Sequence, residues 1–386
     1  MLYLDAAATS PVRREALEAM WPYLTGDFGN PSSRHTVGES AARGLARARA
    51  QVAEFLGCRP AEVVFTAGGT EADNLAVKGI ALGQPRGRHV VTTAIEHEAV
   101  LESVDQLRRL HGFEVSFVPL TPEGLVTPAA LESVLRADTT LVSIAHANNE
   151  IGTVQDLAAL SAVTSSAGVP LHTDAVQSAG VLSVDVSGIG VQALSLSGHK
   201  LGAPKGIGAV FLSSRLAVEP VLSGGGQERG RRSGTENVAG AVALGAAVEL
   251  LGRERAAEAP GAEAPDAASR PRDALIDGVL SAIPESALTG SRTSRLPRHA
   301  SFVFSGVSGE SVLLELERRG VVSSSGSACA AGRDEPSHVL TALGLEPDLA
   351  GTAVRFSWGA DVSGEQLHGV VGLLAESVAA VRGIAV

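Results

Sequence analysis

The sequence predicts an α/β protein in which a mainly parallel sheet is covered by helices on both faces and is followed by a smaller α+β unit. Over roughly the first two-thirds of the chain, short β-rich runs alternate with helical stretches, as is typical of parallel sheets. The length of 386 residues exceeds what a single hydrophobic core usually organises, so two domains are expected. The composition also changes between residues 253 and 272, which become rich in Ala, Glu, Arg and Pro.

Strands are expected where a short run of β-branched or apolar residues lies between turn residues. In chain order the expected strands are residues 62–66, 89–93, 115–118, 141–145, 169–173 and 191–196. Helices are expected from about Glu71 and through residues 101–104, each shortly after a strand. Ligands of such sheets bind beyond the carboxyl ends of the strands, so polar residues that follow a strand are candidates for a site.

The segment 253–272 predicts an exposed connection between a large domain and a C-terminal one. Its prolines, Pro260, Pro265 and Pro271, should interrupt any long helix there. After it, a strand at residues 300–304 and a helix from Glu310 predict the smaller α+β unit.

Charge and composition exclude several classes of protein. The formal net charge of −11 argues against direct, tight binding to nucleic acid, although residues 227–232 form a local basic patch. No apolar run approaches the roughly 20 residues that span a bilayer, and residues 1–5 lack the features of a signal peptide. Only two cysteines are present, as is typical of a reducing compartment. A cytoplasmic protein that binds no membrane is expected.

A lysine and an aspartate follow two different apolar stretches. Lys200 comes directly after the run 191–196, and Asp174 ends the stretch that contains residues 169–173. Pyridoxal phosphate (PLP) chemistry needs this pair, because a lysine forms the Schiff base and a carboxylate pairs with the pyridinium nitrogen. Most lysines are solvated surface charges, and Lys205 is interpreted as one, or as a contact of a glycine loop.

Other polar residues after strands each have a functional and a structural interpretation. Gly69 and Thr70 open a helix and could hold a phosphate, or form an ordinary capped turn. His97 could stack on a cofactor ring, or cap the next helix. The amide of Asn149 could bond a phenolate oxygen, or stabilise a turn, and Gln177 has the same two interpretations.

The two cysteines differ in their surroundings. Cys329 lies among Ser, Gly and Ala in the stretch 323–332, which offers little bulk to bury a thiol. Cys58 follows Phe55-Leu56-Gly57 and fits a buried, inert side chain. We therefore interpret Cys329 as the reactive thiol.

Motifs of one enzyme family occur in order along nearly the whole chain. They are residues 3–11, 30–35, 65–75, 96–97, 148–152, 172–177, 195–208, 224–237, 324–329 and 355–357. In this order they resemble the cysteine desulfurases of the nitrogen-fixation and iron–sulfur-cluster type, within the class V aminotransferase family. The form Ser-Ser-Gly-Ser-Ala-Cys, residues 324–329, is similar to the group with a long cysteine-bearing loop.

The resemblance implies a fold like that of aspartate aminotransferase, with a seven-stranded, mainly parallel sheet. It implies a large PLP-binding domain at residues 13–255 and a small α+β domain made of residues 1–12 and 256–386, which carries the cysteine loop. Two departures stand out: Ala6 replaces a residue that is larger in many relatives, and the Pro-rich stretch 256–271 interrupts a helix that is usually continuous.

The resemblance also implies a role for each matching residue. Lys200 is the Schiff-base lysine and moves the Cα proton, Cys329 is the nucleophile, and His97 stacks on the ring. The other cofactor contacts implied are Gly69, Thr70, Asn149, Asp174, Gln177, Ser197, His199 and, reaching the phosphate of a partner subunit, Thr235. Arg355, helped by Asn30, binds the substrate carboxylate. No metal is held by this chain alone, although Cys329 could join a partner in holding an iron–sulfur cluster.

The implied activity is a PLP-dependent L-cysteine desulfurase that acts as a homodimer. It converts L-cysteine to L-alanine and forms a persulfide on Cys329, which passes to an acceptor protein in iron–sulfur assembly, tRNA thiolation or DNA phosphorothioation. The alternatives are a class V aminotransferase or selenocysteine lyase on the same fold, and a sulfur-carrier subunit with weak turnover.

Overall fold

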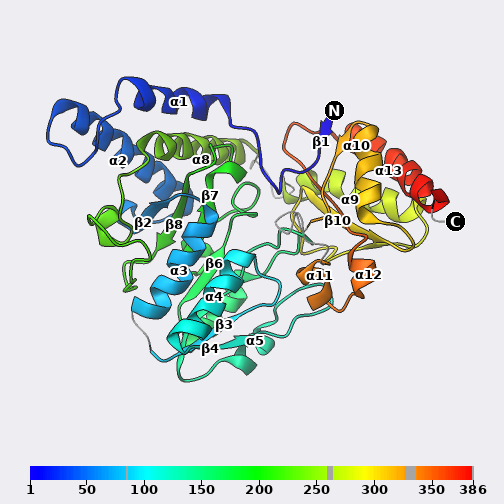
Figure 1. Cartoon of the computed structure of the whole chain (residues 1–386), viewed down its shortest axis with the longest axis horizontal. Helices are drawn as coiled ribbons and strands as arrows, with labels where there is room; N and C mark the ends of the chain where they lie inside the picture. The colour runs from blue at the N-terminus through cyan, green and yellow to red at the C-terminus, as the bar shows by residue number, and fades with distance from the viewer. Residues whose placement is uncertain (84–85, 259–263, 327–335, 385–386) are drawn as a thin grey trace.

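A seven-stranded sheet with the strand order β2-β8-β7-β6-β5-β3-β4 forms the body of the protein (Figure 1). The computed structural model describes residues 1–83, 86–258, 264–326 and 336–384. The strands are β2 (Val63–Thr66), β3 (His89–Thr92), β4 (Glu114–Phe117), β5 (Thr139–Ser143), β6 (Leu171–Asp174), β7 (Ala193–Ser197) and β8 (Gly208–Leu212). Strands β4, β3, β5, β6 and β7 run parallel, whereas β8 is antiparallel to both of its neighbours.

The structure confirms the α/β class and all six strands expected in this part of the chain, and each strand end lies within two residues of its expected position. Strand β8 was not predicted. It follows the glycine-rich stretch 202–208 and has only a short apolar run, Ala209–Leu212, whose pattern does not distinguish a strand from a buried helical segment.

Helices cover both faces of the sheet, because alternate side chains along each strand point to opposite faces. On one face, Val64, Val90 and Leu141 share a buried cluster with α3 (Gly69–Gly83) and α4 (Glu98–His111). On the other face, neighbouring residues such as Phe65 and Val91 pack with further helices. These are α2 (Thr36–Leu56), α5 (Pro128–Val134), α6 (Leu157–Ser166), α7 (Val186–Ile189) and α8 (Val238–Glu258), with α1 (Arg14–Thr25) packed on α8.

A second, smaller unit holds the three-stranded antiparallel sheet β12-β10-β9 (Figure 1). Its strands are β9 (Ser286–Leu288), β10 (His299–Phe304) and β12 (Val354–Ser357), and its helices are α9 (Ala264–Ala282), α10 (Gly309–Arg318), α11 (His338–Ala342), α12 (Pro347–Ala350) and α13 (Gly364–Ile384). Strand β1 (Leu2–Tyr3) pairs with β11 (Val321–Val322), so the N-terminus joins this unit. Leu4 and the ring of Phe302 lie in its core, where Phe302 also contacts Phe304 and Phe356.

One expectation about the connection was wrong. Helix α9 begins at Ala264 and continues through Pro271 to Ala282, so Pro271 does not interrupt it. Pro265 is the second residue of α9, where a missing N–H costs nothing because the first turn has no intrahelical acceptors. Helix α8 likewise extends to Glu258, and only residues 259–263 between the two helices lie outside the described ranges.

Within the described ranges, no helix is both long and apolar enough to cross a membrane. Three or more His, Cys, Asp or Glu side chains that could bind one metal ion are also not found together in that part of the chain.

Candidate active site

A cavity of about 250 Å³ lies beyond the carboxyl ends of β3, β5, β6 and β7, between the large sheet and the small unit. The structure brings together in its wall the following predicted residues: His97, Asn149, Asp174, Gln177, Lys200 and Arg355. They come from loops that directly follow parallel strands, and Arg355 is added by β12 of the small unit. A second cavity of about 610 Å³ shares Gln177 and Lys200 with the first.

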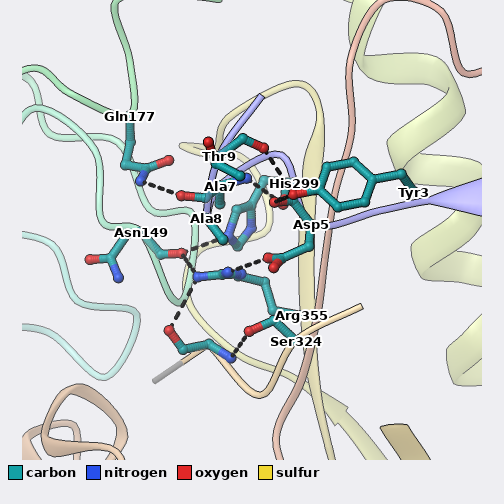
Figure 2. A network of polar contacts seen from close by, with 12 residues as sticks. Tyr3, Asp5, Ala7, Ala8, Thr9, Asn149, Gln177, His299, Ser324 and Arg355 are labelled. Carbon is teal, nitrogen blue, oxygen red and sulfur yellow. Dashed lines mark hydrogen bonds and ion pairs between the residues drawn. The ribbon is translucent and has the colours of Figure 1, made fainter. Parts of the chain in front are cut away.

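Lys200 ends a short 3₁₀ turn, Gly198–Lys200, that follows β7 and turns its side chain into the cavity. Its Nζ donates hydrogen bonds to the backbone carbonyl of Ala7 and, at 2.6 Å, to that of Ala8. Gln177 Nε2 donates to the same Ala7 carbonyl at 3.1 Å, as Figure 2 shows. The N-terminal segment therefore crosses the cavity and holds both side chains.

Asp174 ends β6 and is almost fully buried, with 8% of its surface exposed. Its Oδ1 accepts a hydrogen bond from the backbone N–H of Val176 at 2.8 Å. Burial raises the pKa of this carboxyl, and the charges of His97 and Lys200 and the Val176 N–H oppose that rise. A protonated ring nitrogen placed in the cavity would favour the ionised carboxylate in the same way.

His97 serves as the N-cap of α4, where its Nδ1 accepts from the backbone N–H of Ala99 at 3.0 Å. The structural interpretation of this histidine is thus confirmed, and the ring also lines the cavity. The same residue therefore caps the helix and lines the cavity.

The preceding residue, Glu96, holds two loops of the site together. Its carboxylate accepts from Thr93 Oγ1 at 2.7 Å and from the backbone N–H of Ala145 at 2.9 Å. Burial raises the pKa of Glu96 to about 8. The carboxyl therefore takes up a proton in the folded state at pH values where it is ionised in the unfolded chain.

We expect the stability that Glu96 contributes, relative to Glu96→Gln, to fall as the pH rises. A folded pKa near 8 lies above the unfolded value of 4.5, so the contribution is complete below about pH 4.5 and is lost through pH 8. Between pH 6 and pH 8 the loss should be about 2 kcal/mol. Urea unfolding of both proteins across this pH range measures the difference in their free energies of unfolding. A difference that does not change with pH would contradict the expectation.

The residues expected to bind a phosphate, Gly69, Thr70, Ser197 and His199, do not line this cavity, although Gly69 lies next to Val176 of its wall. Gly69 is buried at the start of α3, where a Cβ would come within 2.9 Å of Val176 Cγ2 and 3.3 Å of Ser197 Cβ. Thr70 is the next residue of that helix and is exposed. His199 Nδ1 lies 3.1 Å from Thr9 Oγ1, and burial together with Lys200 and Lys205 lowers the pKa of His199 to about 4. A neutral His199 can donate a hydrogen bond to an anion there.

These features fit PLP. The buried Asp174 suits the ring nitrogen, the flat ring of His97 lies beside the cavity, and the absence of a side chain at Gly69 leaves the helix N-terminus open to a phosphate.

Arg355 is almost fully buried, with 2% exposed, and its guanidinium bonds three segments (Figure 2). Nη2 donates to Asp5 Oδ1 at 2.6 Å, and Nη1 donates to the carbonyls of Asn149 at 2.9 Å and Gly326 at 3.1 Å. Nε has no partner among the described residues. Because Arg355 lines the cavity, its guanidinium suits the binding of a small carboxylate.

Some predicted residues lie outside this cavity. Asn30 is exposed, and its Oδ1 accepts from the backbone N–H of Ser32 at 2.9 Å, so it forms a local turn. Thr235 is exposed just before α8. Cys329 falls within residues 327–335 and lies outside the described residues. Burial raises the pKa of Cys58 to about 12, which agrees with an inert thiol.

Sequence reasoning assigned no role to Asp5 or His299, although both contact the Arg355 network. His299 Nε2 donates to the Asn149 carbonyl at 3.2 Å, and burial keeps this histidine neutral by lowering its pKa. Asp5 stands in the first matching motif, residues 3–11, and that motif was the signal that could have identified it. For His299 the sequence holds no comparable signal.

Comparison with known proteins agrees with this geometry. The family model for aminotransferase class-V matches residues 2–370. The chain is 41% identical to the cysteine desulfurase IscS of Dictyoglomus turgidum, over 99% of this chain and 96% of that protein. It is similar to the solved structure of a NifS-like protein, with a TM-score of 0.88, 32% identity and coverage of 98% and 99%. It is also similar to SspA in complex with cysteine, with a TM-score of 0.79, 35% identity and coverage of 92% and 98%.

Two observations agree. The chain matches these proteins along nearly its whole length, and Lys200, Asp174 and Arg355 line one cavity. The chain therefore belongs to the class V aminotransferase family, as an enzyme of the cysteine desulfurase group that includes IscS and the NifS-like proteins.

Proposed function

We propose that this enzyme converts L-cysteine to L-alanine with PLP bound in the 250 Å³ cavity, and that it passes the sulfur through a persulfide on Cys329 to an acceptor protein. The observation that carries the proposal is the convergence of Lys200, Asp174 and Arg355 on that one cavity. The relative solved with cysteine bound supports L-cysteine as the substrate.

PLP would be held by Asp174 at the ring nitrogen, by His97 over the ring, and by Asn149 and Gln177 at the phenolate oxygen. Gly69, Thr70, Ser197 and His199 would hold its phosphate. When bound, PLP supplies an electron sink for the electrons of the substrate Cα–H bond. Asp174, whose ionised form is favoured by His97, Lys200 and the Val176 N–H, would maintain this capacity.

The chain's own residues perform the remaining tasks. Arg355, whose side chain lines the cavity, binds the substrate carboxylate through its guanidinium. Lys200 Nζ, held at the cavity wall by the carbonyls of Ala7 and Ala8, moves the proton at the substrate Cα. The buried, apolar wall that Ile95 and Val176 provide excludes water from this step.

Cys329 takes the sulfur. Its thiolate attacks the substrate Sγ, the Cβ–Sγ bond breaks, and the two electrons of that bond go to the carbon, which gains a proton. L-Cysteine and the Cys329 thiol thus become L-alanine and a Cys329 persulfide, with no external oxidant. Two contacts just before residue 327 support this role, because they hold the chain next to Arg355. The Gly326 carbonyl accepts a hydrogen bond from Arg355 Nη1, and the Ser324 backbone pairs with that of Arg355.

The proposed acceptor is a cytoplasmic protein that carries a nucleophilic group. Iron–sulfur assembly, tRNA thiolation and DNA phosphorothioation each fit such a donor, and the net charge of −11 favours delivery through a protein over direct contact with nucleic acid.

Asp5 should matter for substrate binding, because it holds Arg355 by an ion pair at 2.6 Å. In Asp5→Asn we expect KM for L-cysteine to rise about tenfold with kcat changed much less, since a charge-assisted bond that fixes the guanidinium is weakened. Steady-state kinetics measure the two constants. An unchanged or lower KM would mean that Asp5 competes with the substrate for Arg355.

We also propose a homodimer. Helix α1 presents a stripe of exposed apolar side chains at helical spacing, Leu17, Trp21 and Leu24, with 53%, 62% and 55% of their surfaces exposed, and Phe28 follows at 69%. Exposed apolar groups gathered in this way are typical of an interface. Thr235 is exposed in its own chain, as a contact with a partner subunit would require.

Leu24→Asp is therefore expected to produce a monomer, because a charge cannot be buried unpaired in an apolar interface. Leu110→Asp is the matched control, since Leu110 is exposed to 63% on α4, away from the stripe. Sedimentation velocity measures both. A dimeric Leu24→Asp protein, or a monomeric wild type, would contradict the proposed interface.

The activity itself is tested by absorbance of the purified protein, followed by addition of L-cysteine with a reductant. We expect the band of bound PLP and equal amounts of sulfide and alanine. Bound PLP without sulfide would indicate the aminotransferase or selenocysteine lyase alternative. A protein that binds no PLP would leave only the sulfur carrier.

A further inference from the structure

A row of three polar side chains crosses the sheet beneath the cavity. Ser143 of β5, His172 of β6 and Ser195 of β7 lie side by side on the face that α3 covers, and all are fully buried. His172 Nδ1 lies 2.9 Å from Ser143 Oγ, and His172 Nε2 lies 3.0 Å from Ser195 Oγ. Each ring nitrogen therefore has one hydroxyl partner.

Asp73 of α3 points at this row from the covering helix. Only 1% of Asp73 is exposed, and its Oδ1 lies 3.7 Å from His172 Nε2 without a hydrogen-bond partner among the described residues. The Ser195 hydroxyl favours the ionised form of this carboxyl and so opposes the rise of its pKa, but burial and the charge of Asp174 raise the pKa more. A buried carboxyl with an unpaired oxygen is costly when it is ionised, so its state requires an explanation.

The ring of His172 cannot supply a positive charge that would compensate an ionised Asp73. Burial lowers the pKa of His172 to about 3, so the imidazole is neutral, and one ring nitrogen donates while the other accepts. If Asp73 carries a proton, it donates to Ser195, Ser195 donates to His172 Nε2, and His172 Nδ1–H donates to Ser143. If Asp73 is ionised, every bond in the row must point the other way.

The charge of Asp174 determines which of the two hydrogen-bond directions is favoured. It lies two residues after His172 on β6, on the same face, and it pairs in register with Ser195. Burial raises the pKa of both Asp73 and Asp174, and each carboxylate disfavours ionisation of the other. Lys200, His97 and the Val176 N–H favour charge on Asp174, whereas the charges that act on Asp73 are those of Asp174 and Glu96, both negative.

We propose that Asp73 is a positioning residue that holds a buried proton at the end of the Ser195–His172–Ser143 row and so leaves the negative charge of the pair on Asp174, facing the ring nitrogen. The inference rests on the proposed PLP site. It assigns a function to a carboxyl that does not line the cavity, and it explains why α3, whose first turn would hold the phosphate, also carries an acid into the layer below.

The first test compares Asp73→Asn with Asp73→Ala and Ser195→Ala, by titrating each apo-protein with PLP and following absorbance. An asparagine is neutral and can donate through Nδ2–H, so Asp73→Asn should keep the PLP dissociation constant within about twofold and leave the pH titration of the bound chromophore unchanged. Asp73→Ala and Ser195→Ala break the row and should weaken PLP binding about tenfold. Equal weakening in Asp73→Asn and Asp73→Ala, or a shifted titration in Asp73→Asn, would overturn the proposal.

The second test needs no variant to bind PLP. Infrared spectra of wild-type holoenzyme labelled with [4-¹³C]aspartate should show the C=O stretch of a protonated carboxyl, and this band should be missing from Asp73→Asn. A wild-type spectrum with carboxylate bands alone would overturn the proposal. Failure of wild-type protein to bind PLP would instead contradict the proposed function, so the two failures are distinguishable.

Discussion

Replacing Lys200 with alanine should lower the rate of alanine formation from L-cysteine by about a thousandfold or more, because in the proposed function Lys200 both attaches the cofactor and moves the Cα proton. The side chain enters the cavity from the end of β7, and its Nζ is fixed there by the Ala7 and Ala8 carbonyls. Asp174, His97 and the phosphate-binding residues remain in Lys200→Ala. The variant should therefore still bind PLP, with the absorbance of the unattached cofactor.

Lys205→Ala is the matched control, because Lys205 is exposed five residues further along the same loop. Rates of alanine formation and absorbance spectra of both variants, measured together, separate loss of the reacting amine from loss of charge near the site. Comparable rates for Lys200→Ala and wild type would refute the assigned role. A large loss in Lys205→Ala would shift that role to the loop as a whole.

Replacing Cys329 with serine should abolish persulfide formation and sulfide release while the chromophore of bound PLP stays intact. Serine has nearly the same size, but its hydroxyl is not a nucleophile toward sulfur at neutral pH, since the thiolate is the reactive species. We expect the rate of sulfide release to fall by at least about a thousandfold, as for loss of a nucleophile in covalent catalysis. Sulfide assays without an added thiol acceptor measure it.

The matched variant is Cys58→Ser. Cys58 packs against the core beside the end of α2, and burial raises the pKa of its thiol to about 12, so it stays protonated. Activity should remain close to that of wild type. Sulfide release by Cys329→Ser at the wild-type rate would mean that the substrate sulfur leaves without this thiol, as in the selenocysteine lyase or aminotransferase alternative.

Much of the fold followed from local pattern. Strands such as β2 and β3 are short, largely apolar runs between turn residues, and the alternation of such runs with helices predicted a parallel sheet. Strand β8 was missed because Gly208–Leu212 follows a glycine-rich loop and is buried on both faces, so it shows no period. Pro271 was misjudged because packing of α9 on α13 outweighs its local cost. The domain division at residues 13 and 255 stays a prediction.

The part of the site that lies at the carboxyl ends of parallel strands could be predicted from the sequence. Parallel strands end at the same edge, so Asp174 after β6 and Lys200 after β7 had to be neighbours once both strands were recognised. Asp5 and His299 come from the N-terminal segment and from β10, which meet the site only through tertiary packing. The same is true of Asp73, whose helix position alone does not tell that it faces His172.

The most direct test of this account is a single turnover without reductant. Holoenzyme is mixed with L-cysteine, alanine is quantified, and the peptide that contains Cys329 is analysed by mass spectrometry. We predict one alanine per subunit and a mass increase of one sulfur atom on Cys329, with Cys58 unmodified. Alanine formed without sulfur on Cys329, or sulfur on Cys329 without alanine, would contradict the transfer of substrate sulfur to this residue.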